Sequence, residues 1–244
     1  GENEVRAIDG VNLTIEHGEF VAIIGQSGSG KSTLMNMLGL LDVPTSGKYL
    51  LNGKDVEGLT DDELSEIRNK EIGFIFQGFN LITSLTAVEN VELPLVYRGM
   101  KKEERNKLAI EALDRVGLSD FKYSYPHELS GGMKQRVAIV RSLLNHTPIL
   151  LMDEPFSAVD MQNRHSLQEQ LLGVWKRFET TIVFVTHDVD EAVFLADKIV
   201  IMDKNPGRIQ QIVEVDLPRI RKRDSKEFLD LLEYVESLLG VWED

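Results

Sequence analysis

One segment near the N-terminus constrains the fold more than any other part of the chain. Residues 25–32 are Gly-Gln-Ser-Gly-Ser-Gly-Lys-Ser, which matches the spacing G-x-x-x-x-G-K-S. The apolar run Phe20–Ile24 comes before this segment, and Lys31–Leu40 has the composition of a helix. A glycine-rich turn between a buried strand and a helix is typical of a loop whose backbone N–H groups surround phosphate. The sequence therefore predicts an α/β fold with a nucleoside triphosphate site.

The residue types in this loop have chemical reasons. Glycines allow successive N–H groups to approach phosphate oxygens, and the helix start adds the positive end of its dipole. Lys31 is placed to neutralise the β- and γ-phosphates, and the Ser32 hydroxyl is placed to bind Mg²⁺. The flanking strand and helix disfavour a chance glycine-rich turn. We expect nucleotide contacts from Gly25, Gln26, Ser27, Gly28, Ser29, Gly30, Lys31, Ser32 and Thr33.

A second apolar run, Ile149–Met152, ends in two carboxylates, Asp153 and Glu154. We expect Asp153 to hold Mg²⁺ through its water shell. Glu154 would face the γ-phosphate and orient or deprotonate the attacking water, because phosphoryl transfer needs mostly positioning and charge neutralisation. The alternative is a polar strand end that caps the turn at Pro155.

The rest of the chain alternates short apolar runs with amphipathic stretches, which indicates an α/β core with parallel strands covered on both faces. From about Phe79 to Asn145 the periodicity is helical, which predicts a helical insertion between core strands. After Pro218 comes a basic patch, Arg219–Arg223, and then an acidic amphipathic helix from about Ser225 to Leu239. The helix could serve subunit contact or regulation, but docking on its own domain is the favoured interpretation. Further core strands are expected at Ile72–Phe76, Ile149–Met152, Thr181–Val185 and Lys198–Met202.

Composition limits the function classes. The 244 residues are 42% hydrophobic and 27% charged, enough for one large domain or one domain with an insertion. The net charge of −13 disfavours nucleic acid as a partner. The absence of cysteine excludes disulfides. No apolar run approaches the roughly 20 residues of a membrane span, so we expect any membrane association to go through a partner.

Residues 129–135, Leu-Ser-Gly-Gly-Met-Lys-Gln, complete a larger pattern. With them the chain resembles the ATP-binding cassette family over essentially its whole length. The family signature is L-S-G-G-Q, and Met133 takes its last position, as is frequent in cassettes of nutrient importers. Ser130 and the amides of Gly131 and Gly132 are typical of a capped helix start that binds an anion. The resemblance implies that this anion is the γ-phosphate of ATP held by a second copy of the chain.

Three further residues match the family pattern. Gln77 matches the Q-loop glutamine, which contacts Mg²⁺ and the attacking water and leads into the helical insertion. Asp160 belongs to a segment that resembles the D-loop, which crosses the dimer interface. His187 matches the switch histidine that hydrogen-bonds the γ-phosphate, although alone it would pass for a helix-start residue. The resemblance implies that Glu154, His187 and Gln77 are catalytic and that Ser32, Gln77 and Asp153 serve the metal.

The fold implied is α/β, a P-loop NTPase cassette with a mainly parallel core sheet, an N-terminal antiparallel β portion and an inserted helical subdomain. We expect an ATPase domain over residues 1–223, with a RecA-like core at 1–78 and 146–215 and the helical subdomain at about 79–145. Residues 224–244 would form the C-terminal amphipathic helix. The family stacks adenine on an aromatic residue upstream of the first core strand. No aromatic residue precedes Phe20, so adenine specificity comes from the resemblance alone.

The function implied is ATP binding and hydrolysis by a homodimer around two Mg-ATP, which drives an integral-membrane permease from the cytoplasmic face of the cell membrane. Residues 20–99 resemble macrolide or lipoprotein export cassettes, and residues 126–223 resemble nitrate, sulfonate and taurine import cassettes. We favour an importer, which would add a solute-binding protein as a partner.

Four alternatives remain beside an importer. An exporter and a mechanical ATPase of lipoprotein release or cell division are compatible with the first half. A soluble cassette protein of DNA repair or translation is disfavoured by the acidic charge and the single cassette. A P-loop kinase is disfavoured because it has no role for the signature or for His187.

Overall fold

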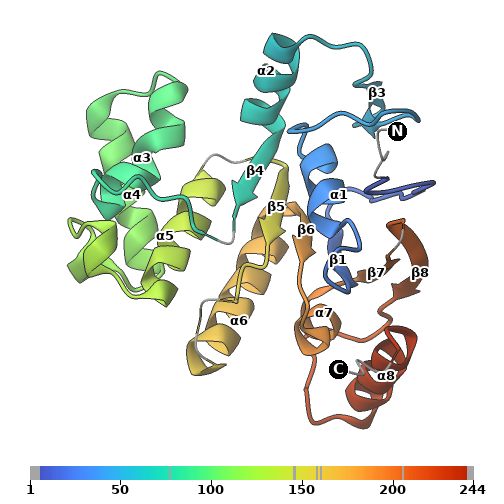
Figure 1. The fold of residues 1–244 in the computed structure, drawn as a ribbon. Coiled ribbons are helices and arrows are strands. Elements are labelled where there is room, and N and C mark those ends of the chain that lie inside the picture. The colour runs from blue at the N-terminus through green and yellow to red at the C-terminus, as the bar shows by residue number, and fades with distance from the viewer. Residues whose placement is uncertain are drawn as a thin grey trace. The chain divides into compact units, whose positions relative to one another are not determined.

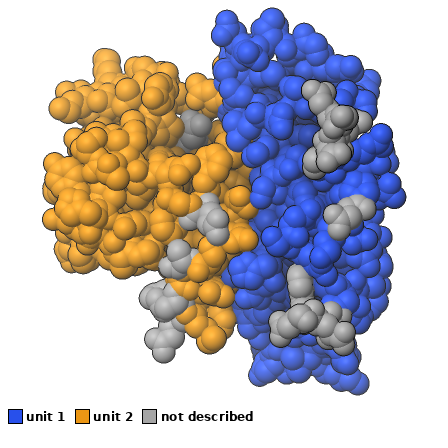
Figure 2. Space-filling view, viewed as in Figure 1, with its two compact units in different colours: residues 1–68, 179–244 blue, residues 69–178 orange. Residues whose placement is uncertain are grey.

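The computed structural model describes residues 6–76, 78–144, 147–157, 159, 161–204 and 206–240, with the backbone alone at 162, 163, 174, 177 and 178. It has two compact units (Figure 2). Unit 1 consists of Gly1–Arg68 and Glu179–Asp244, and unit 2 is Asn69–Phe178. Figure 1 labels their helices and strands.

Unit 1 is built on four neighbouring strands in the order β6-β1-β7-β8. The central strand β1 is parallel to β6 and to β7, whereas β8 is antiparallel to β7. All residues of β1 and β6 are buried, as expected for β-branched runs covered on both faces. The rings of Phe20 and Phe184 meet edge to face across this core, with centroids 5.5 Å apart. The strands are β1 (Phe20–Gly25), β6 (Thr181–Val185), β7 (Lys198–Asp203) and β8 (Arg208–Glu214).

Short helices and a small hairpin complete unit 1. The strands β2 and β3 form an antiparallel hairpin. Among the described residues of unit 1, the other antiparallel pair is β7 with β8. Helix α2 begins in unit 1 and ends in unit 2. These elements are α1 (Lys31–Leu38), β2 (Leu50–Leu51), β3 (Lys54–Asp55), α2 (Asp61–Glu71), α7 (Val189–Leu195) and α8 (Lys226–Leu238).

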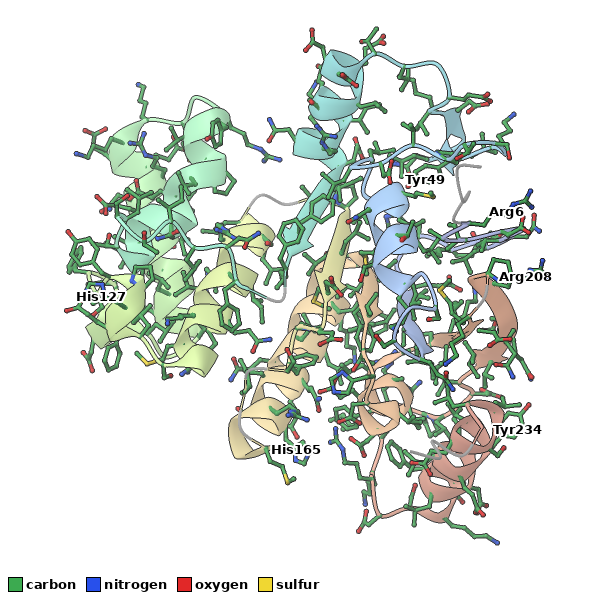
Figure 3. The ribbon with its side chains drawn as sticks, in the orientation of Figure 1. Arg6, Tyr49, His127, His165, Arg208 and Tyr234 are labelled. Atoms are coloured by element: carbon green, nitrogen blue, oxygen red, sulfur yellow. The ribbon has the colours of Figure 1, made fainter. Side chains whose placement is uncertain are left out.

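The C-terminal helix α8 packs on unit 1. Phe228 and Val235 on its apolar face are 1% and 0% exposed. The Gln210 amide donates to the Leu238 carbonyl (2.9 Å), and the Gln211 amide donates to the Tyr234 hydroxyl (2.8 Å), so β8 holds the helix. Figure 1 shows α8 beside α7 and β8, and Figure 3 labels Tyr234 on it.

Unit 2 contains the parallel pair β4 and β5 and a group of helices. Helices α3, α4 and α5 share an apolar core in which Val91, Leu113 and Val137 are fully buried. The elements are β4 (Ile72–Ile75), α3 (Ala87–Tyr97), α4 (Lys102–Arg115), the 3-10 turns η1 (Ser119–Phe121) and η2 (Pro126–Glu128), α5 (Gly131–Leu144), β5 (Ile149–Asp153) and α6 (Met161–Phe178). In the described part of the chain, no helix has both the length and the apolar character that a bilayer crossing requires.

Candidate nucleotide site

The predicted phosphate loop joins the end of β1 to the start of α1. Gly25, Gly28 and Gly30 have φ angles of 154°, 81° and 86°. A side chain at Gly25 would collide with the backbone of Met202, and one at Gly30 would collide with the side chain of Ile8. The glycines are therefore needed both for their conformation and for the close packing around them.

The loop has groups suited to an anion. The Lys31 ammonium lies 2.8 Å from the carbonyl oxygens of both Gly25 and Gln26, which holds its charge at the loop. Helix α1 has Gly30 as its N-cap residue, so no side chain caps it, and its first turn has no acidic residue. The Ser29 hydroxyl is buried and has no hydrogen-bond partner. An uncapped helix start beside an ammonium group favours phosphate.

His187 lies at the same edge of the unit 1 strands as this loop. Because β1 and β6 are parallel, their carboxyl ends meet at one edge, with Ile23 opposite Val185. The Thr186 N–H donates to the Ile23 carbonyl (3.2 Å), which ties the segment after β6 to β1. His187 follows directly and is exposed. The structure therefore brings the predicted switch histidine and the phosphate loop to one edge of the sheet.

A hydrogen-bond network shapes the backbone around His187. The Thr186 hydroxyl donates to the buried Glu191 carboxylate (2.7 Å) and accepts from the Asp188 N–H (3.1 Å). The Asp188 carboxylate accepts from the Glu191 N–H (3.3 Å) and so caps α7. The sequence did not predict the roles of Thr186 and Glu191, because no motif indicates that their side chains form a hydrogen bond.

In unit 2, Asp153 ends β5 and Glu154 follows it, both half-buried. Glu154 has a φ angle of 44°, a conformation that non-glycine residues rarely adopt and that costs about 1–3 kcal/mol. The Ser157 N–H and hydroxyl both donate to the Glu154 carbonyl, at 3.3 and 3.0 Å, which holds this turn. Strain of this kind is concentrated at functional sites, which agrees with the chemical role expected of Glu154.

The predicted signature segment starts α5 in unit 2. The exposed Ser130 accepts from the Met133 N–H through its hydroxyl (3.3 Å), so it caps the helix as predicted. Leu129, one residue earlier, is anchored in the apolar core of α3, α4 and α5. Gly131 and Gly132 form the first turn of α5. The helix start is thus held firmly while Ser130 faces solvent.

The fully buried Gln135 in α5 is a further residue that sequence reasoning missed. Neither polar atom of its amide has a hydrogen-bond partner. Its burial could not be read from the motif, since polar residues at a helix start are usually exposed.

The predicted site residues fall into two groups. Residues 25–33 and His187 belong to unit 1, whereas Asp153, Glu154 and residues 130–132 belong to unit 2. The exposed Ser32 in unit 1 and Asp153 in unit 2 are the described candidates for Mg²⁺. The other two predicted residues, Gln77 and Asp160, lie outside the described residues.

The chain is similar to known proteins in both sequence and fold. The family model described as ABC transporter matches residues 8–157. The nitrate import ATP-binding protein NrtD of Synechocystis is 45% identical over 88% of this chain and 77% of its own length. The macrolide export ATP-binding/permease protein MacB of Hyphomonas neptunium is 50% identical over 77% of this chain, which spans 29% of that protein.

A solved structure is similar over almost the whole fold. It is the dimeric, post-hydrolysis state of an ATP-binding cassette bound to ADP and Pi, with 42% sequence identity and a TM-score of 0.82 over 89% of this chain and 94% of that one. The resemblance inferred from the motifs and the predicted α/β cassette fold are both confirmed. The chain belongs to the ABC transporter family, as an ATP-binding cassette subunit.

Proposed function

We propose that this subunit hydrolyses ATP as a homodimer, with each Mg-ATP held between residues 25–33 of one copy and residues 130–132 of the other. The observation that carries the proposal is the pair of phosphate-type helix starts, at α1 and at α5, which belong to different units of the chain. The similar cassette solved as a dimer with ADP and Pi supports it.

In the proposed reaction, backbone N–H groups of the loop and the Lys31 ammonium hold the β- and γ-phosphates. Ser32, Asp153 and Gln77 would hold Mg²⁺, which when bound would supply positive charge beside the phosphates. Glu154 orients or deprotonates the water that attacks the γ-phosphate, and His187 donates a hydrogen bond to that phosphate. Each residue acts by positioning or by charge, as phosphoryl transfer requires.

Dimer closure follows from the γ-phosphate contacts. Ser130 and the first N–H groups of α5 would make charge-assisted hydrogen bonds to ATP held by the other copy, where Asp160 crosses the interface. Hydrolysis and phosphate release remove these bonds. Because only the closed dimer uses both sides of the γ-phosphate, ATP shifts the population to that state and its loss reverses the shift.

The closing motion would drive an integral-membrane permease and place the subunit at the cytoplasmic face of the cell membrane. The nitrate import relative supports an importer, which would include a solute-binding protein. The macrolide export relative supports an exporter as the second candidate.

The domain division is part of the proposal. The RecA-like core would take residues 1–78 and 146–215, and the helical subdomain would take about 79–145, within an ATPase domain that ends at 223. The shared apolar core of α3, α4 and α5 supports the subdomain. Residues 224–244 would form the C-terminal amphipathic helix.

Complementation between two inactive variants tests the shared site. Lys31→Ala destroys the loop half of a site, and Ser130→Arg destroys the signature half. In a mixed dimer, both changes fall in one site and the other site is intact. A one-to-one mixture is half mixed dimers, so about a quarter of wild-type ATPase activity should return.

The matched control is the double variant Lys31→Ala/Ser130→Arg in one chain, mixed with either single variant, which leaves no intact site in any dimer. Binding of ATP to the Ser130→Arg monomer should persist. If mixed dimers form, as shown by two affinity tags, and activity stays at zero, the shared site is wrong.

A further inference from the structure

The segment between β8 and α8 has an inverted pattern of burial. Arg221 is 5% exposed and the Arg223 side chain is 24% exposed, whereas Ile220 is 79% exposed. Burying a guanidinium group is unfavourable unless its donors find partners, so an arginine turned inward has a specific structural task. We name Arg221 and Arg223 together the arginine clamp.

Arg221 holds the C-terminal end of α7. Its Nη1 donates to the carbonyls of Val193 (2.8 Å), Phe194 (3.3 Å) and Ala196 (2.6 Å). The last carbonyls of a helix lack partners within the helix, and a cation there also complements the dipole. Burial lowers the pKa of Arg221 to about 10, so the group stays charged near neutral pH.

The other donors of Arg221 fix the segment it belongs to. Its Nη2 donates to the Val215 carbonyl (3.2 Å), and its Nε donates to the Leu217 carbonyl (3.3 Å). One planar guanidinium thus joins the end of α7 to the irregular segment that follows β8. A lysine could not reproduce this set, because its ammonium is a point donor with a different geometry.

Arg223 holds the beginning of the same helix. Its Nε donates to the Asp190 carboxylate at 2.6 Å, and its guanidinium lies 3.7 Å from the ring centroid of Phe194. Asp190 and Phe194 are four residues apart and so share one face of α7. The cation therefore contacts the helix at an ion pair and at an aromatic ring.

Helix α7 depends on such external contacts. It has seven residues, too few for an isolated helix to be stable in water, so its position comes from tertiary packing. Asp188 caps its first turn, and Glu191 in that turn accepts from Thr186. His187 stands between Thr186 and Asp188, so its backbone position follows the position of α7.

We propose that Arg221 and Arg223 are positioning residues for His187, holding α7 at both ends so that the histidine side chain meets the γ-phosphate. The proposal rests on the proposed function, because it takes the γ-phosphate as the group that His187 contacts. If the arginine clamp had a purely structural role, its removal would lower the free energy of unfolding but would not move His187 in the molecules that remain folded.

Arg223→Gln is the informative variant, because its side chain is partly exposed and the protein should fold without it. Its matched control is Arg208→Gln, which removes an exposed ion pair to Asp9, a residue outside α7. Figure 3 shows Arg208 near Arg6, which also pairs with Asp9.

The first readout is the imidazole NMR signal of His187 in the nucleotide-free protein, assigned by its loss in His187→Ala. Of the five histidines, His187 alone should shift or broaden in Arg223→Gln. The second readout is kinetic: a misplaced group lowers kcat by about tenfold or more, while the nucleotide dissociation constant should change by less than about twofold because the loop is untouched.

Two further variants sharpen the test. Asp190→Asn removes the ion pair but keeps the contact between Arg223 and the Phe194 ring, so it should lower kcat by no more than Arg223→Gln does. The double variant should be no worse than Arg223→Gln alone, because that change already removes the ion pair. Arg221→Lys should cause a larger loss of kcat than Arg223→Gln, since more carbonyls lose their donor.

An unmoved His187 signal in Arg223→Gln together with an unchanged kcat would overturn the clamp, and so would equal effects in Arg208→Gln. Failure of the proposed function is separate: a wild-type protein without ATPase activity would refute hydrolysis, and the imidazole signal would then still decide whether Arg223 positions His187.

Discussion

At the scale of single residues, the candidate site depends on backbone conformations that most side chains avoid. Gly25 and Gly30 leave space for the backbone of Met202 and for the side chain of Ile8, which pack directly on the loop. Glu154 adopts a left-handed conformation in spite of its side chain. The glycines were predictable from the motif, whereas the strain at Glu154 depends on the turn that Ser157 holds and has no sequence signal.

Replacing Glu154 by glutamine removes the carboxylate and keeps its shape. Glu154→Gln should bind ATP as wild type does, lose turnover by about 10²-fold or more because general-base assistance is gone, and accumulate as an ATP-bound dimer. ATPase assays and size-exclusion chromatography measure these effects, with Glu179→Gln at the exposed residue directly after α6 as control. Full turnover by Glu154→Gln would refute the role of this carboxylate.

The buried Gln135 amide predicts a gain in stability on substitution. Because neither polar atom has a partner, Gln135→Met should raise the free energy of unfolding by about 1–2 kcal/mol, the desolvation cost that the amide bears. Gln170→Met is the control and should change it by less than about 0.5 kcal/mol, since Gln170 is exposed on α6 and its amide donates to the exposed Ser166 of the same helix. Chemical denaturation compares the two. A destabilised Gln135→Met would mean that the amide has a partner in solution.

At the scale of elements, buried strands were predicted well. The runs of apolar residues expected at Phe20–Ile24 and Lys198–Met202 agree with β1 and β7 to within a residue, and Thr181–Val185 is β6 as predicted. The strand β8 was not predicted, because its burial alternates and its sequence resembles a polar loop. The two-residue strands β2 and β3 are too short for any periodic pattern.

The start of α3 shows how local chemistry fixes an element. Thr86 accepts from the Glu89 N–H (3.4 Å), and the Glu89 carboxylate accepts from the Thr86 N–H (2.8 Å) and hydroxyl (2.7 Å). These hydrogen bonds from Thr86 hold the pKa of Glu89 below its usual value. Such a reciprocal capping box is recognisable in the sequence Thr-x-x-Glu.

Thr86→Ala should lower the free energy of unfolding by about 1 kcal/mol at pH 7. The pKa of Glu89 is lowered in the folded state, so its contribution is present above the unfolded carboxyl pKa of about 4.3 and is lost as pH falls through the folded value. The difference between wild type and variant should therefore narrow below about pH 4. Denaturation at a series of pH values measures it, with the exposed Thr83→Ala as control. A difference independent of pH would contradict the coupling to Glu89.

Adjacent residues of α8 test how that helix is held. Phe228 is 1% exposed and Leu229 is 49% exposed. Phe228→Ala should lower the free energy of unfolding by about 3–5 kcal/mol because it leaves a cavity. Leu229→Ala should change it by less than about 0.5 kcal/mol. Thermal or chemical unfolding compares the pair, and a large loss of dimerisation in Leu229→Ala would instead favour a subunit contact.

At the scale of the whole molecule, the motifs predict a nucleotide site that a single copy of the chain cannot complete. The loop with Lys31 and the turn with Ser130 are the two segments proposed to bind phosphate, and they belong to different units of the chain. Family membership and fold followed from motif order, because each motif needs one residue type at one strand or helix end. The arginine clamp on α7 was not predicted. In the sequence, Arg221 and Arg223 form part of a basic patch, and nothing there indicates their carbonyl and carboxylate partners.

The most direct test of the account is a cross-link between the two phosphate-binding segments. The chain has no cysteine, so introduced thiols report single contacts. In the Glu154→Gln background, one tagged protein carries Ser27→Cys and another carries Ser130→Cys, both at exposed positions. The control pairs Ser27→Cys with Ser84→Cys, which is also at an exposed position and lies in the same unit as Ser130.

With Mg-ATP and a short bifunctional thiol reagent, we expect a cross-link between the Ser27→Cys and Ser130→Cys copies. This cross-link should be absent with ADP and absent from the control pair. If size-exclusion chromatography detects ATP-dependent dimers but this cross-link does not form, the claim that two copies of the chain hold one phosphate group is contradicted.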